Sequence, residues 1–179
     1  MLPSALRLIE QFSTSTDRPG ITNVSLHPIS WNEASVLERR FRPGISPQEA
    51  LALAADLLHE DYAYVFEANW DLWTPETVSG PWVRRPTAVN FIVRGEEFEE
   101  GESKAEGEIE VDFGFDTPFL YEEQQLTGEL DSRVRANVQT LVDFVHRAEK
   151  HSGAVTRLLW SESDENLAQK LVSRLQRTQ

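Results

Sequence analysis

The spacing of apolar residues changes several times along the chain, and its first part predicts helices. Apolar residues three apart predict a short helix over residues 4–12, and a thinner apolar face predicts another over 32–41. The clearest helix start is Ser46-Pro47-Gln48-Glu49, with an N-cap hydroxyl, a proline at the first helical position and a glutamate three residues after the cap. We expect this helix to run to about His59.

The middle of the chain alternates between apolar and polar residues, as strands do. Residues 62–70 place aromatic and alanine side chains on one face, and residues 87–94 repeat the pattern with Val, Phe and Val. Residues 108–115 alternate most regularly, with Ile109, Val111, Phe113 and Phe115 on one side. A brief earlier strand is predicted around Val24 and Leu26. Consecutive strands without a helix between them usually pair antiparallel.

The last part of the chain returns to helical spacing. Residues 131–150 predict a long amphipathic helix, followed by a strand at 155–160 and a final helix that begins near Ser161 or Ser163. This order of elements indicates an α+β fold. We expect a largely antiparallel sheet, a three-stranded meander plus one or two further strands, with helices packed on one face. A length of 179 residues favours a single domain over 1–179.

Composition excludes several kinds of site. The chain has no cysteine, so disulfides, thiolate metal sites and cysteine nucleophiles are excluded. No apolar run approaches the roughly 20 residues that a membrane-spanning helix needs. The first residues of the chain do not resemble a secretory leader, so we expect a cytoplasmic protein without membrane contact.

Acidic residues are concentrated in one segment. Residues 95–129 hold 13 Asp or Glu against the single Lys104, which accounts for −12 of the net charge of −13. Such a block disfavours binding to nucleic-acid phosphates. One interpretation is a solvated hairpin that aids solubility. The other is an acidic surface for a basic protein partner, formed by Glu99, Glu100, Glu102, Glu108 and Glu110.

Tryptophan and arginine gather between the two longest predicted strands. Three of the five tryptophans lie within residues 70–82, in a Pro-rich stretch that we interpret as a connection. Tryptophan and arginine are enriched in interface hot spots. Trp73, Trp82, Arg84 and Arg85 are therefore candidate binding residues. The alternative is that the rings close one end of the core while the arginines pair with acidic residues.

The sequence carries few signs of catalytic or metal-binding motifs. The four histidines form no close ligand pair, and the sequence has no GxSxG elbow, P-loop or GxGxxG. Glu108, Glu110 and Asp112 would form a row of carboxylates along one sheet face. A hydrolase or a magnesium or calcium site could use such a row, but the polar outer face of an antiparallel sheet has the same pattern. We therefore predict no metal site and no cofactor.

Two hypotheses follow from these patterns. The first is a non-enzymatic interaction protein, such as an adaptor, inhibitor or immunity-type binder, which uses the acidic hairpin and the adjacent Trp/Arg stretch. The second is a small enzyme or ligand-binding domain with a pocket between sheet and long helix, where Glu67, His59 and Asp112 supply acid–base groups and Trp73 covers the ligand. Apolar surface on the thin N-terminal elements also allows a homodimer.

Overall fold

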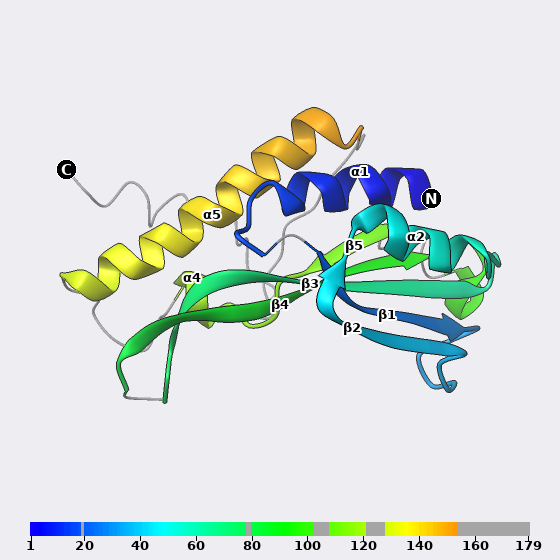
Figure 1. Cartoon of the computed structure of the whole chain (residues 1–179), viewed down its shortest axis with the longest axis horizontal. Helices are drawn as coiled ribbons and strands as arrows, with labels where there is room; N and C mark the ends of the chain where they lie inside the picture. Colours follow the sequence, from blue (N-terminus) through cyan, green and yellow to red (C-terminus); the bar gives the residue numbers. More distant parts are fainter. Residues whose placement is uncertain (19, 78–79, 102–107, 121–127, 154–179) are drawn as a thin grey trace.

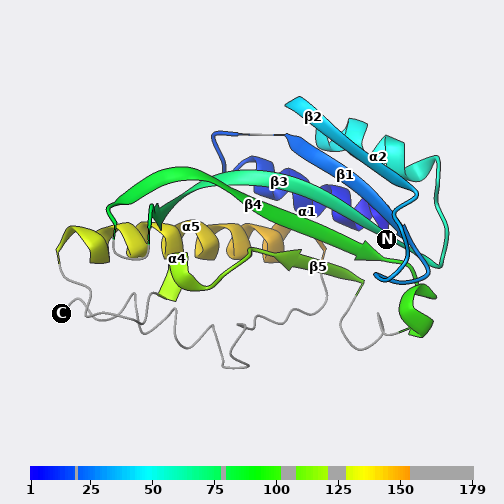
Figure 2. The same ribbon diagram turned by 90° about the horizontal axis from the view of Figure 1, so that it is seen from below.

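A five-stranded antiparallel sheet with helices against one face forms the molecule (Figures 1 and 2). The computed structural model describes residues 1–18, 20–77, 80–101, 108–120 and 128–153. The α+β fold with a largely antiparallel sheet is thus confirmed, while the strand predicted at 155–160 and the final helix lie outside the described residues. The elements, in chain order, are α1 (Leu2–Ser13), β1 (Ile21–Pro28), β2 (Leu37–Ile45), α2 (Pro47–Ala55), β3 (Tyr62–Pro75), β4 (Trp82–Arg94), η1 (Phe98–Gly101), β5 (Ile109–Asp112), α4 (Thr117–Leu120) and α5 (Glu129–His151).

The strand order is β2-β1-β3-β4-β5, and α1, α2 and α5 cover the same face of this sheet. Alternation along β3 and β4 buries the residues that the sequence predicts, among them Phe66, Trp70 and Phe91. Phe12 of α1 lies at the centre of this layer, with its ring centroid 5.3 Å from those of Trp70 and Phe91 and 5.6 Å from that of Phe144 on α5. Packed aromatic rings therefore occupy the space between sheet and helices.

The hairpin of β3 and β4 extends beyond the rest of the sheet. β1 pairs with β3 only as far as Ala68, whereas β3 and β4 stay paired to Pro75 and Trp82. Past Ala68, Asn137 of α5 takes the place of a neighbouring strand. Its Oδ1 accepts from the Trp73 N–H at 2.9 Å, and its Nδ2 donates to the Trp73 carbonyl at 2.7 Å and to the Pro118 carbonyl at 2.9 Å.

The start of α2 confirms the predicted capping box. The Ser46 hydroxyl accepts from the Glu49 N–H, and the Glu49 carboxylate accepts from the Ser46 N–H at 2.9 Å. The Ser46 hydroxyl also donates to the Glu49 carboxylate at 2.7 Å, and this bond, together with the one from the Ser46 N–H, favours the ionised form and holds the pKa of Glu49 below its ordinary value. The helix ends at Ala55, before His59.

The helix predicted over 32–41 is wrong, because residues 37–45 form β2. Leu37 and Phe41, four residues apart, pack against the core, as does Ile45 beyond an irregularity in the pairing with β1. Four residues make about one turn of a helix but also two full periods of a strand, so this spacing fits both structures.

Two other predictions need correction. The Trp- and Pro-rich stretch is mostly strand rather than connection, since Trp73 lies in β3 and Trp82, Arg84 and Arg85 lie in β4. The alternation predicted to Phe115 ends with β5 at Asp112. Gly114 then has a φ of 72°, and the Phe115 side chain is 75% exposed.

Candidate interaction surface at the loop end of the sheet

Three connections meet at the end of the sheet opposite the β3–β4 turn, on the right in Figures 1 and 2. We call residues 29–36, 56–61 and 95–101 the loop end. The Ile29 N–H donates to the Asp61 carbonyl at 2.7 Å, the Glu97 N–H to the Glu60 carbonyl at 2.9 Å, and the Glu99 N–H to the Ile29 carbonyl at 2.8 Å. Each connection is thus hydrogen-bonded through its backbone to the other two.

Gly95 allows two of these connections to approach closely. A Cβ at this position would lie 2.1 Å from the carbonyl oxygen of Glu60 and 3.0 Å from that of Tyr62. The Gly95 N–H donates to the Tyr62 carbonyl at 2.8 Å. The sequence needs glycine here because the opposing atoms belong to backbone and cannot rotate away.

The backbone is unusual where the connections meet. Ile29 has a φ of 62° and Glu99 a φ of 50°. Among the described residues, these are the non-glycine residues with positive φ. They are joined by the hydrogen bond between the Glu99 N–H and the Ile29 carbonyl. The Ser30 N–H also donates to the Pro28 carbonyl at 2.6 Å, which closes a tight γ-turn around Ile29.

Exposed apolar side chains are concentrated at the loop end. Among the described residues, six large apolar side chains are exposed, and five of them lie here. Ile29 is 58% exposed, and the others are Trp31, Val36, Leu57 and Leu58. Apolar exposure gathered in one region is typical of an interaction surface, whereas scattered apolar residues are ordinary.

A small aromatic cluster supports this surface from the open face of the sheet. The centroid of the Trp31 ring lies 5.0 Å from the centroid of the buried Phe98 ring and 5.1 Å from the centroid of the His27 ring. The guanidinium of Arg94 lies 5.9 Å from the centroid of Trp31 and pairs with Glu110 at 2.5 Å. Trp31 is therefore held in place although 38% of it is exposed.

The charge of the loop end has one sign. Its sequence holds eight acidic residues and neither lysine nor arginine. The side chain of Glu100 lies outside the described part of the structure, and none of the ion pairs between described side chains involves the other seven carboxylates. An exposed apolar group surrounded by negative charge favours a partner with apolar side chains and positive charge. The acidic residues are Glu33, Asp56, Glu60, Asp61, Glu96, Glu97, Glu99 and Glu100.

The acidic residues predicted as a binding surface lie in different surroundings. Glu99 belongs to the loop end, and its carboxylate accepts from the Trp31 N–H at 3.4 Å. Glu108 is exposed just before β5, and Glu110 pairs with the buried Arg94. The backbone of Glu100 lies in η1, while Glu102 lies outside the described residues.

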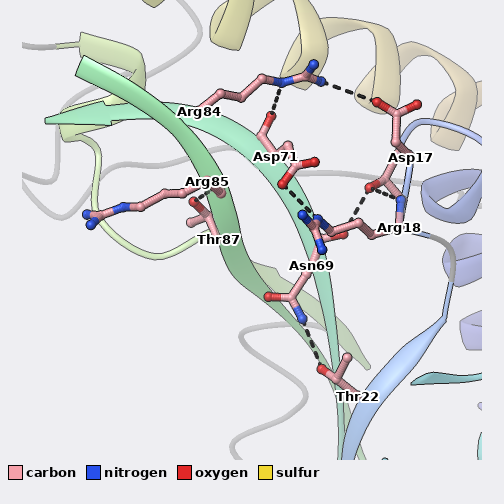
Figure 3. A network of polar contacts seen from close by, with 9 residues as sticks. Asp17, Arg18, Thr22, Asn69, Asp71, Arg84, Arg85 and Thr87 are labelled. Carbon is pink, nitrogen blue, oxygen red and sulfur yellow. Dashed lines mark hydrogen bonds and ion pairs between the residues drawn. The ribbon is translucent and has the colours of Figure 1, made fainter. Parts of the chain in front are cut away.

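The predicted Trp/Arg residues lie at the opposite end of the molecule and contact their own chain. Trp82 is buried, and Trp73 lies beneath Arg133 of α5, 4.6 Å from its guanidinium. Figure 3 shows Arg84 reaching the Asp71 carbonyl and the Asp17 carboxylate, each at 3.5 Å. The exposed Arg85 reaches the Pro75 carbonyl at 3.5 Å. The two rings thus close one end of the core.

The acid–base candidates of the ligand-binding hypothesis are not brought together. Glu67 bonds to the Thr22 hydroxyl at 2.9 Å on the sheet face away from the helices, and Asp112 holds the Gly114 N–H at 2.8 Å. The ring of His59 packs on Tyr62 at the loop end. An open, mostly apolar groove does exist, but it runs along β4 beside residues 113–118 and also touches Arg85.

The sequence search missed one pair of potential catalytic groups. Ser25 and His27 lie two apart on β1, and the Ser25 Oγ lies 3.1 Å from the His27 Nε2. The strand spacing Ser-x-His could have indicated this pair. Ser25 is only 8% exposed, and Nδ1 of His27 is buried without a hydrogen-bond partner, so no third group orients the ring. Burial lowers the pKa of His27, and the Glu38 charge opposes that shift.

Within the part of the chain that the structure describes, no three His, Asp or Glu side chains are grouped as metal ligands. No described helix combines the length and apolar character needed to cross a bilayer.

Comparison with known proteins gives no relative: no family model, curated protein or solved structure matches this chain.

Proposed function

We propose that this chain is a non-enzymatic protein-interaction domain, an adaptor, inhibitor or immunity-type binder, which binds a basic protein through the loop end. The observation that carries the proposal is the concentration of exposed apolar side chains among eight acidic residues without lysine or arginine. Apolar contacts would supply affinity, and the negative charge would speed association and select a basic partner.

The same charges disfavour a symmetric dimer through this surface. A two-fold interface places the same patch of both copies face to face. Eight acidic residues would then oppose eight others, with no lysine or arginine of the loop end to neutralise them. A partner of opposite charge fits better than a second copy.

The proposal is tested by affinity capture from a native lysate with two matched triple variants. The first carries Glu60→Gln, Glu96→Gln and Glu97→Gln, all exposed at the loop end. The second carries Glu76→Gln, Asp143→Asn and Glu149→Gln, which are exposed elsewhere and remove the same charge. We expect a basic protein to be captured by the wild type and by the second variant but not by the first. Identical capture by all three proteins contradicts the proposal.

A further inference from the structure

The γ-turn around Ile29 holds a β-branched residue in a conformation that costs free energy. Left-handed backbone is disfavoured for residues with a Cβ and most of all for β-branched ones, whereas glycine and asparagine adopt it readily. A strained backbone persists where the surrounding structure enforces it, and such strain clusters at binding and switch sites. Here the enforcing contacts come from both neighbouring connections, through Asp61 and Glu99.

Core packing does not account for isoleucine at this position. The side chain is 58% exposed, and Ile29 is absent from the residues that form or line the hydrophobic core. Its N–H and carbonyl groups hold the loop end together, but any residue other than proline provides those groups. The isoleucine side chain is thus presented to solvent at the point where the three connections meet.

We infer that Ile29 is the anchor of the proposed interface, and that the partner contacts it with apolar side chains flanked by lysine or arginine. This inference rests on the function proposed above. The backbone that carries the side chain is fixed by hydrogen bonds before binding, and a β-branched side chain has few χ1 rotamers to lose, so its burial converts more fully into affinity. Asp61 and Glu99, bonded to the backbone of Ile29, place negative charge beside the anchor and thereby favour cations around the apolar contact.

The test uses the full-length chain and a displayed library of random peptides as the probe. Peptides are selected on the wild type and then measured against Ile29→Asn, Ile29→Gly and Phe115→Asn. The first two variants keep a residue suited to positive φ, and the third removes Phe115, which is the most exposed large apolar residue among those described and lies outside the loop end. The loop-end triple variant with Glu60→Gln, Glu96→Gln and Glu97→Gln is measured alongside.

We expect enriched peptides to combine lysine or arginine with apolar residues. Ile29→Asn should weaken their binding on the order of 30-fold, the loss typical of an interface hot spot, while Phe115→Asn leaves it unchanged. The urea midpoints of Ile29→Asn and Ile29→Gly should equal or exceed that of the wild type, because both residues relieve the strain of the turn. Lower midpoints would assign Ile29 a structural role and overturn the inference.

Two further outcomes separate this inference from the proposed function. Basic, apolar peptides that bind Ile29→Asn normally but lose affinity for the triple variant would overturn the anchor role and leave the proposed function standing. Failure to enrich such peptides, or enrichment of peptides that the triple variant binds normally, would overturn both.

Discussion

The hydroxyl of Tyr64 ties the loop end to the core. This ring is fully buried, and its oxygen accepts from the His59 N–H at 2.8 Å and lies 3.1 Å and 3.2 Å from the carbonyl oxygens of Leu57 and His59. Burial raises the pKa of Tyr64 above its ordinary value, so the phenol stays protonated and can donate to one of these carbonyls. A single side chain thereby positions the exposed pair Leu57 and Leu58.

Replacing Tyr64 by phenylalanine tests this role. We expect Tyr64→Phe to lower the free energy of unfolding by about 2 kcal/mol, because the His59 N–H loses its acceptor. Urea denaturation measures the change. Tyr62→Phe is the control, since that hydroxyl makes none of the three hydrogen bonds. Equal stability of the two variants would show that the Tyr64 hydroxyl contributes nothing.

His27 gives the stability a specific dependence on pH. Burial lowers its pKa in the folded protein below the unfolded value, so folding favours the neutral ring. The contribution of the neutral His27 ring to the free energy of unfolding is fully present above the pKa of the unfolded state, about 6.5. This contribution is lost as the pH falls from there through the pKa of the folded state. We expect His27→Gln to flatten the decline of stability between about pH 7 and pH 5, measured by urea denaturation. His151→Gln, at the end of α5, is the control, and parallel curves for wild type and His27→Gln would refute the prediction.

The close approach at Gly95 determines how the connection after α2 packs on the one after β4. We expect Gly95→Ala to lower the free energy of unfolding by about 3 kcal/mol, since its Cβ would meet backbone atoms of Glu60. The affinity of the loop end for the selected library peptides should fall as well, because the two connections must separate. Gly114→Asn is the control: a Cβ there meets nothing within 4 Å, and asparagine tolerates its φ of 72°. Wild-type stability in Gly95→Ala would contradict this account of the packing.

The elements that the sequence predicts well are those whose signal is local. The capping box at Ser46 and Glu49 works through atoms three residues apart, and the alternation in β3 and β4 reflects burial on one face. The helix predicted over 32–41 failed because its spacing of four fits helix and strand equally. The outer half of the β3–β4 hairpin was missed because its prolines suggest a connection, whereas the two strands pair with each other there. The free edge of β3 is satisfied by Asn137, which lies 64 residues away from Trp73 and gives no local signal.

The candidate surface could be predicted only in part. The acidic excess is visible in the sequence, and Glu99 and Glu100 of the predicted set belong to the loop end. The apolar surface was not predictable, since Ile29 and Trp31 come from one connection and Leu58 from another, and only the tertiary structure brings the two together. The predicted Trp73 and Trp82 have the composition of a hot spot, but contacts with α5 and the core occupy them.

The crowded negative charge at the loop end should lower the free energy of unfolding of the whole protein. Like charges repel in the folded state, and salt screens this repulsion over about 10 Å at 0.1 M. The triple variant with Glu60→Gln, Glu96→Gln and Glu97→Gln should therefore be more stable than the wild type at low salt, by about 1 kcal/mol, and the gain should shrink in high salt. Urea denaturation at two salt concentrations measures both values. A gain that persists in high salt would exclude charge repulsion as its cause.

The side chain of Asn137 also has an evolutionary consequence. It replaces a missing strand by offering one acceptor and one donor to Trp73, and it bonds to Pro118 as well. Aspartate lacks the donor, and glutamine is a methylene too long to keep both hydrogen bonds with the helix axis in place. Natural variation should therefore be strongly restricted at residue 137, although it lies far from the loop end. If the proposed function holds, the exposed side chains at 29, 57 and 58, which pack less against their own chain, would instead vary together with the surface of the partner.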